Sequence, residues 1–283
     1  MILVFGHSGQ VASELRRRDG VTALGRDEVD LAQPGQAAAA IRRVRPELII
    51  NAAAYTAVDQ AEQDEAAAAR LNAEAPAEIA QAAAGMGVPV VQISTDYVYD
   101  GSGARAWVPD DATGPLGAYG RTKLAGDRAV VAAGGAHAVL RTSWVFSAHG
   151  QNFVKTMLRL GRDREALSIV ADQVGGPTSA ASIAEAALKI GQALRDDGNK
   201  SGIYHFSGAP AVSWADFARE IFAQARLPVD VGDIASEAYP TPAQRPLNSR
   251  LDCTSTARVF GIEQPDWRKD LADVLNDLSE AGQ

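Results

Sequence analysis

The chain of 283 residues has little of what several classes of protein need. Cys253 is its only cysteine, so no disulfide can form within the chain, and a reducing compartment fits this composition. No apolar run reaches the roughly 20 residues that a membrane-spanning helix requires. The four histidines, at 7, 137, 149 and 205, lack the spacing of metal ligands. We therefore expect a cytoplasmic protein with no disulfide, membrane span or histidine-based metal site.

Positive charge is also too scarce and too scattered for a nucleic-acid-binding surface. Lysine and arginine number 27 against 35 aspartate and glutamate, which gives a net charge of −8, and no basic stripe stands out. An acidic protein can still bind an anionic small molecule through helix ends and a few arginines. The length suits one large α/β domain, or a domain with a small lobe.

Apolar runs that resemble strands alternate with helical patterns in the first half. We expect strands at 2–5, 21–24, 47–51, 88–94 and 137–142. We expect helices near 9–18, 35–44, 62–84 and 119–133, with Pro76 kinking or dividing the third. This alternation predicts an α/β fold with a doubly wound parallel sheet of the Rossmann type. The second half is less regular, with helices expected near 151–162, 180–196, 213–226 and 267–280 and a strand at 203–206. The polar segment 101–116 is expected to be a loop near the mouth of an active site.

The first predicted strand leads directly into a glycine turn and a helical pattern. The spacing from Gly6 through Gly9 to Ala12 resembles the dinucleotide fingerprint, with one residue more between the first two glycines. Gly6 permits a tight turn, and Gly9 lets the backbone approach a pyrophosphate at the start of the helix. A plain turn between strand and helix is the alternative. The apolar start is too short for a signal peptide, so we expect it to be a strand.

Tyr119 and Lys123 lie four residues apart on a predicted helix and therefore share one face. Tyrosine ordinarily titrates near about 10. We expect the lysine ammonium one turn away to lower the pKa of Tyr119, which would make this pair a proton donor and acceptor. Upstream, the strand at 88–94 leads into Thr95, whose hydroxyl can donate to a substrate carbonyl. A surface pair and an ordinary strand-end cap are the alternatives for these residues.

These features, in this order, resemble the extended short-chain dehydrogenase/reductase superfamily, and within it the dTDP-4-dehydrorhamnose reductase family. The matching stretches span nearly the whole chain: 6–11, 51–59, 94–101, 115–126, 141–146, 152–158, 172–178 and 239–251. In related 4,6-dehydratases an Asp-Glu pair follows the threonine, whereas Asp96 and Tyr97 follow it here. The related 4-epimerases usually carry Ser-Ser or Ser-Ala at this point. The resemblance thus points to ketone reduction.

The resemblance implies that NADPH or NADH reduces the C4 ketone of dTDP-4-dehydro-β-L-rhamnose to dTDP-β-L-rhamnose. This is the final step of dTDP-rhamnose biosynthesis, which supplies cell-wall polysaccharide. It further implies that Tyr119 gives a proton to the C4 oxygen, Lys123 holds the nicotinamide ribose, and Thr95 hydrogen-bonds the same oxygen. We expect residues 1–150, with segments returning from the second half, to form the NAD(P)-binding domain. Residues 151–283 should form mainly a substrate-binding lobe interleaved with it.

The resemblance also assigns cofactor contacts around the glycine turn and along the sheet edge. Besides Tyr119 and Lys123, the expected contacts are Gly6, Gly9, Gln10, Val11, Arg26, Asp30, Leu31, Ala54, Tyr55 and Thr56. Arg26 follows the second predicted strand, where an arginine suits the 2′-phosphate of NADPH. The adjacent Asp27 weakens this argument, and a solvated charge pair is the alternative. We expect a preference for NADPH over NADH.

Substrate contacts implied by the resemblance come from both halves of the chain. Asp96 should touch the substrate beside Thr95, with a turn-stabilising role as the alternative. Trp144 should contact the deoxysugar, with core packing as the alternative. Arg245 should grip the diphosphate, since arginine suits bidentate phosphate binding. For Arg250 a surface salt bridge is favoured instead.

Metal binding, oligomeric state and substrate identity stay open at this stage. Some family members are reported as metal-linked dimers, and Glu14 falls where one acidic ligand would lie. No other ligand can be matched, and a solvated Glu14 is favoured. A Mg²⁺ requirement and the choice between monomer and homodimer are thus undecided. Other possible functions are reduction of another nucleotide-linked 4-ketosugar, or a non-catalytic regulatory subunit of the methionine adenosyltransferase type. The intact Thr95, Tyr119 and Lys123 argue against the latter.

Overall fold

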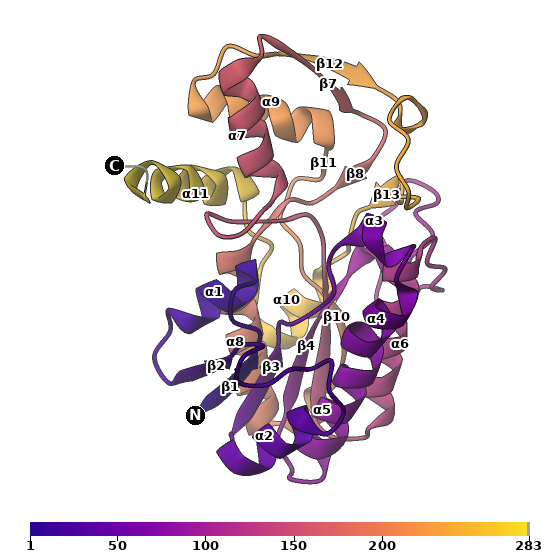
Figure 1. The fold of residues 1–283 in the computed structure, drawn as a ribbon, viewed down its shortest axis with the longest axis vertical. Coiled ribbons are helices and arrows are strands. Elements are labelled where there is room, and N and C mark those ends of the chain that lie inside the picture. The colour runs from indigo at the N-terminus through magenta and orange to yellow at the C-terminus, as the bar shows by residue number, and fades with distance from the viewer. Residues whose placement is uncertain (282–283) are drawn as a thin grey trace.

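The computed structural model describes residues 1–281, and a six-stranded parallel sheet forms its centre (Figure 1). The strands are β1 (Ile2–Phe5), β2 (Val21–Leu24), β3 (Leu48–Asn51), β4 (Val90–Thr95), β5 (His137–Thr142) and β10 (Gly202–His205). Their order is β2-β1-β3-β4-β5-β10. The direction of winding reverses between β1 and β3, and ligands bind at such a point in open α/β sheets. The predicted doubly wound parallel sheet is confirmed.

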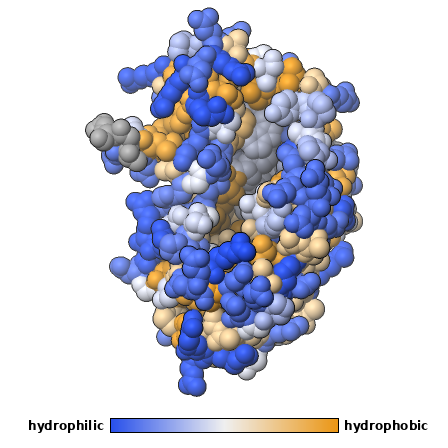
Figure 2. Space-filling model, in the orientation of Figure 1, coloured by the Kyte–Doolittle hydropathy of each residue, from blue (hydrophilic) through white to orange (hydrophobic). Residues whose placement is uncertain are grey.

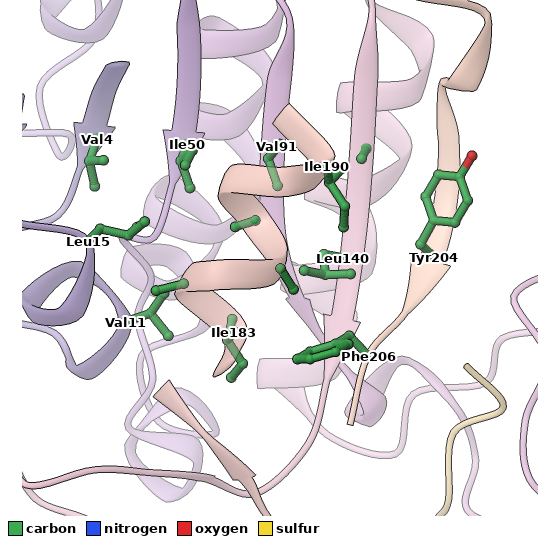
Figure 3. Packing of buried hydrophobic residues seen from close by; sticks show 14 of the residues in the cluster. Val4, Val11, Leu15, Ile50, Val91, Leu140, Ile183, Ile190, Tyr204 and Phe206 are labelled. Atoms are coloured by element: carbon green, nitrogen blue, oxygen red, sulfur yellow. The ribbon is translucent and has the colours of Figure 1, made fainter. Parts of the chain in front are cut away.

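Helices cover both faces of the sheet because alternate strand residues point to opposite sides. On one face, Val4 and Ile50 pack with Leu15 of α1 (Gln10–Arg16) and with Ile183 and Ile190 of α8 (Ala180–Asp196), as Figure 3 shows. On the other face, strand residues pack with α2 (Gln36–Val44), α5 (Ala75–Ala84) and α6 (Ala118–Ala132). The buried strand residues on both faces explain why the strands read as continuous apolar runs.

The long helical stretch expected at 62–84 is divided. It consists of α4 (Glu65–Ala69), a π-helical turn (Arg70–Glu74) and α5, and the short helix α3 (Val58–Ala61) precedes it. Pro76 lies in the first turn of α5. Because proline has no backbone N–H to donate, the wider turn before it accommodates the missing hydrogen bond. The predicted division at Pro76 is confirmed.

A smaller group of elements lies above the sheet in Figure 1 and has its own core. Its helices are α7 (Phe153–Asp163), α9 (Trp214–Ala225) and α11 (Trp267–Ala281), and β7 (Ala166–Val170) pairs in parallel with β12 (Asp230–Ile234). The shorter strands are β6 (Val145–Phe146), β8 (Val174–Gly175), β9 (Thr178–Ser179), β11 (Val212–Ser213) and β13 (Asn248–Ser249). The four helices and the strand expected in the second half are confirmed. The β7–β12 pair and α10 (Thr254–Phe260) were not predicted.

The segment 101–116 contains no helix and only one isolated bridge, between Trp107 and Leu251. The indole of Trp107 stacks on Tyr99 with ring centroids 4.7 Å apart, and its Nε1 donates to the carbonyl of Asn248. These contacts hold the loop against the strand β13 and the residues after it. No helix within residues 1–281 has the length and apolar character to cross a membrane.

Candidate active site

A cleft of about 1270 Å³ lies between the sheet and the smaller lobe. Figure 2 shows this face of the molecule hollowed between its two parts. Every residue expected from the sequence to bind cofactor or substrate or to act in catalysis lines it: Gly6, Gly9, Gln10, Val11, Arg26, Asp30, Leu31, Ala54, Tyr55, Thr56, Thr95, Asp96, Tyr119, Lys123, Trp144 and Arg245. The loop 101–116 was expected at the mouth of the site, but none of its residues lines the cleft, since it packs against residues 248–251 instead.

The glycine turn brings the ends of β1 and β3 into close contact at the cleft. Gly6 has a φ of +112°, and a Cβ there would lie 3.2 Å from the carbonyl carbon of Ala52. Only glycine adopts this conformation at such a close approach without strain. The side chain of Gln10 turns away from the turn, because its Oε1 accepts hydrogen bonds from Ser147 (2.8 Å) and Asn152 (3.0 Å). The backbone of the turn therefore faces the cleft.

The three residues predicted to be catalytic meet where β4 ends and α6 begins. Thr95 is the last residue of β4, and Tyr119 and Lys123 lie on the first two turns of α6. Glu62 fixes the start of α6 by accepting a hydrogen bond from the backbone N–H of Ala118 at 2.7 Å. The helix can approach the β4 end this closely because position 120 is glycine, where a Cβ would lie 2.2 Å from the carbonyl oxygen of Tyr97.

Burial raises the pKa of Tyr119, and a weaker hydrogen-bonding contribution from Thr95 acts in the opposite direction. The expectation that Lys123 lowers this pKa is therefore wrong for this structure, because removing the phenol from water has the larger effect. Lys123 is itself only 2% exposed and donates from Nζ to the carbonyl of Ile93 at 2.7 Å. Burial lowers the pKa of Lys123 to about 8. At neutral pH, Tyr119 is thus protonated beside a lysine that still carries charge.

Asp96 presents a buried carboxylate with one oxygen free for a ligand. Its side chain is 3% exposed, and Oδ1 accepts a hydrogen bond from the Thr95 hydroxyl at 3.1 Å. Within residues 1–281 its buried Oδ2 has no hydrogen bond of normal geometry, although the Ser249 side chain lies near enough to lower the pKa of the carboxyl. Burial raises the pKa of Asp96 to about 6. Because a buried acceptor without a partner is unfavourable, a ligand hydroxyl would be stabilised at this position.

Aromatic side chains form the part of the cleft wall that belongs to the smaller lobe. Trp144 lies in the left-handed region, with a φ of +48°, and its ring stacks on Trp214 with centroids 3.6 Å apart. Phe153 lies against Trp214. Gly175 makes room for this arrangement, since a Cβ there would lie 2.8 Å from the Trp144 ring. Trp144 therefore packs in the lobe and also lines the cleft. Core packing and contact with a deoxysugar, the two roles considered for it from the sequence, are thus compatible.

The charged residues at the cleft differ in how they are held. The side chain of Arg26 is 82% exposed and lies 3.6 Å from Asp30, whereas Asp27 does not line the cleft. Arg245 is half-buried and paired with Asp59. Arg250 lies outside the cleft and donates to the amide oxygen of Asn248 at 3.0 Å, so the expected salt bridge is replaced by a neutral partner.

Several cleft residues were not predicted from the sequence. Among them are Asp59, Arg70, Tyr97, Phe153, Trp214 and Phe217. Asp59 lies inside a stretch that carried the family resemblance, so that motif offered a signal. Trp214 and Phe217 lie on α9, far along the chain, and no local pattern distinguished them from core aromatics.

Glu14 lies outside this cleft, in a depression of about 480 Å³ beside α8 and α11. The expectation that it is solvated is wrong, because α1 packs against α8 and buries it. Its carboxylate lies 3.1 Å from His149 Nε2 and 3.8 Å from Arg17. Within residues 1–281, no three histidine, cysteine, aspartate or glutamate side chains are grouped so as to hold a metal ion.

Known proteins share the sequence and the fold of this chain. A family model described as the RmlD substrate binding domain matches residues 1–280. A dTDP-4-dehydrorhamnose reductase of Sinorhizobium fredii is 43% identical over 278 residues, which cover 95% of this chain and 94% of that protein. The chain belongs to the dTDP-4-dehydrorhamnose reductase family.

Solved members of the dTDP-4-dehydrorhamnose reductase family have the same fold. The structure from Clostridium acetobutylicum is 34% identical, with a TM-score of 0.92 and coverage of 98% of this chain and 99% of that one. The structure from Bacillus anthracis, in complex with NADP, is 32% identical, with a TM-score of 0.90 and coverage of 98% of each chain. The family resemblance inferred from the motifs is thereby confirmed.

Proposed function

We propose that this protein reduces the C4 ketone of dTDP-4-dehydro-β-L-rhamnose with NADPH, giving dTDP-β-L-rhamnose in the last step of dTDP-rhamnose biosynthesis. Family membership over nearly the whole chain supports this function. The observation that carries it is the meeting of Thr95, Tyr119 and Lys123 in one cleft with the glycine turn at Gly6. The compartment we propose is the cytoplasm, because Cys253 is a buried free thiol.

The residues of the cleft fit a nicotinamide dinucleotide. The residues of the glycine turn, 6–9, line the cleft, where their backbone can approach a pyrophosphate. When bound there, a reduced nicotinamide would supply the hydride for C4 of the sugar. Tyr119 donates its proton to the C4 oxygen, and its raised pKa keeps that proton in place until the oxygen becomes basic. Thr95 would turn its hydroxyl proton from Asp96 to the same oxygen as charge develops.

We assign the deoxysugar to the space between Asp96 and the aromatic wall of Trp144 and Trp214. The free Oδ2 of Asp96 would accept from a sugar hydroxyl, and a sugar ring can pack on the indole face. Arg245 would bind the diphosphate. The lobe formed mainly by residues 151–283 would thus bind substrate, while residues 1–150 bind the cofactor.

The preference for NADPH rests on Arg26. Its exposed ion pair with Asp30 contributes little to stability, so the guanidinium is free to turn to a 2′-phosphate. Asp27, the residue that would favour NADH, lies outside the lining of the cleft. Both features support NADPH as the better cofactor.

The deciding experiment follows NADPH absorbance with purified protein and dTDP-4-dehydro-L-rhamnose. Rapid oxidation by the natural protein, and a loss of about 10² to 10⁴-fold in kcat for Tyr119→Phe, are expected because a positioned general acid contributes this much. Tyr239→Phe, which removes an exposed hydroxyl outside the cleft, serves as the control and should behave like the natural protein.

No oxidation by folded protein that still binds NADPH would overturn the proposal. Oxidation with a different nucleotide-linked 4-ketosugar would then identify the alternative substrate. Absence of turnover with any such sugar would favour the regulatory-subunit function.

A further inference from the structure

A chain of buried polar groups lies behind Lys123, outside the cleft, and the proposed reaction does not use it directly. Asp127 lies one turn after Lys123 on α6 and is 1% exposed. Arg141, on β5, is 2% exposed, and its Nε donates to Asp127 Oδ2 at 3.1 Å. Two opposite charges are therefore buried together, one of them on α6 four residues after the lysine of the active site.

The guanidinium of Arg141 is held on its other side as well. Its Nη1 donates to the Tyr99 hydroxyl at 2.8 Å and to the carbonyl of Pro109 at 3.4 Å. The Tyr99 hydroxyl lies 2.8 Å from Nε2 of His205, and burial lowers the pKa of His205 to about 3. His205 is thus neutral, and every partner of Arg141 apart from Asp127 is uncharged. Asp127 is the counter-ion that fixes this arginine in the core.

This pairing keeps Asp127 ionised. Burial raises the pKa of the Asp127 carboxyl, and the charges of Arg141 and Lys123 oppose that rise. Arginine stays protonated in proteins, so a neutral Asp127 would leave a buried guanidinium without compensation, an arrangement that is strongly unfavourable. Within residues 1–281 the buried Oδ1 of Asp127 has no hydrogen bond of normal geometry, and the nearby Ser94 hydroxyl on β4 also lowers the pKa of this carboxyl. Since residues four apart share a helix face, this charge acts on Lys123.

We propose that Asp127 is a positioning residue for the reduction: held by Arg141, its carboxylate keeps the buried Lys123 charged beside Tyr119. The inference rests on the proposed function, in which Lys123 binds the cofactor ribose. The groups that face Lys123 are Asp127 on its own helix and the carbonyl of Ile93 on β4, with Arg141 beyond on β5. Of these, Asp127 is the anion.

The test removes both buried charges together. In Asp127→Asn with Arg141→Gln, neutral amides replace the pair, so no unpaired charge remains in the core. The Asp127 charge opposes the fall in the pKa of Lys123 that burial causes, so its removal makes the ammonium lose its proton at lower pH. We expect the alkaline limb of the kcat/KM profile to move to lower pH by about one unit. The ratio of kcat/KM of the natural protein to that of the variant should therefore grow about tenfold from pH 6 to pH 9. Asp127→Glu, which keeps the charge, should restore most of the natural profile.

NADPH binding, followed by nicotinamide fluorescence without sugar, gives a second readout. The pH at which NADPH binding is half lost should be lower in the double variant than in the natural protein. In Lys123→Met, NADPH binding should no longer depend on pH over this range. This readout stays valid even if the sugar assigned above is wrong, which separates failure of this inference from failure of the proposed function. Should the double variant not fold, Asp127→Asn with Arg141→Met, which also removes the buried guanidinium, is measured in the same way and the same shift is expected.

A matched control removes an exposed ion pair between the same helix and α4. Arg121 of α6 pairs with Glu65 at 2.8 Å, and the double variant Glu65→Gln with Arg121→Gln should leave the alkaline limb where it is. A purely structural role for Asp127 would lower activity by the same factor at every pH. Such a uniform loss, or an unchanged midpoint of NADPH binding, would overturn the proposal.

Discussion

Arg245 and Asp59, 186 residues apart in the chain, form two parallel hydrogen bonds at the edge of the cleft. The distances are 3.1 Å from Nη1 to Oδ1 and 2.9 Å from Nη2 to Oδ2. The hydrogen bond from Arg245 holds the pKa of Asp59 below its ordinary value. Asp59 belongs to α3 after β3, and Arg245 precedes β13, so this pair fastens the sheet side of the cleft to the segment that leads into the lobe.

Replacing Arg245 should weaken binding of the nucleotide sugar selectively. Charge-assisted hydrogen bonds to a phosphate are worth roughly 1.5–3 kcal/mol, so Arg245→Ala should raise KM for the sugar about 10 to 100-fold. KM for NADPH should stay unchanged. Steady-state kinetics with each substrate varied in turn measures both. Arg250→Ala is the control, because Arg250 lies outside the cleft; equal effects of the two variants would contradict the assignment.

Replacing Arg26 should change the choice of cofactor. Without its guanidinium, a 2′-phosphate loses a charged partner, so Arg26→Ala should raise KM for NADPH about tenfold and leave KM for NADH unchanged. Arg42→Ala, an exposed arginine on α2, controls for general loss of positive charge. Equal turnover of both cofactors by the natural protein, or equal changes in both KM values, would contradict the assignment of Arg26 to the 2′-phosphate.

The elements that the sequence predicted well are those whose local pattern and burial agree. β1 and β3 are buried on both faces and therefore read as apolar runs, and Gly6 marks the turn at the edge of the sheet. By contrast, the β12 segment at 230–234 contains a glycine and two aspartates, which disfavour strands. It becomes a strand by pairing with β7, a contact that no local pattern reveals.

The features of the site that the sequence did not predict depend on packing between segments that are distant in the chain. The pairing of Asp127 with Arg141, and the position of Trp214 in the cleft, require the sheet and the lobe to be assembled. The pKa of Tyr119 went against the sequence-based expectation for the same reason. Helical spacing predicted the lysine beside it, whereas the burial that raises its pKa comes from the whole cleft.

The close packing of α6 makes Gly120 sensitive to substitution. Gly120→Ala would place a Cβ 2.2 Å from the carbonyl oxygen of Tyr97, so the helix must shift and the stability to urea should fall by about 1–3 kcal/mol or more. Tyr119 would move with the helix, and kcat should fall as well. Gly85→Ala is the matched control, because a Cβ there would meet the nearest atom at an ordinary 3.5 Å. Equal stability of both variants would argue against the tight contact.

Asp96 should lower stability at neutral pH in exchange for substrate binding. Its pKa of about 6 in the folded protein lies above its ordinary value of 3.8, so the folded state binds the proton more tightly. The free energy of unfolding therefore falls as pH rises between about 4 and 6, and the full penalty of about 3 kcal/mol is present above that range. Asp96→Asn carries no such penalty, so it should be more stable than the natural protein at pH 7.5 while losing activity.

The stabilisation by Asp96→Asn should shrink as pH falls, and urea unfolding at pH 7.5 and pH 5 measures this change. Asp100→Asn provides the comparison, because hydrogen bonds from Ser102 lower the pKa of Asp100, the opposite direction. Replacing Asp100 should therefore give no gain at pH 7.5. If Asp96→Asn were instead destabilised equally at both pH values, the free Oδ2 of Asp96 would have a partner in the folded protein, and its assignment to a substrate hydroxyl would fail.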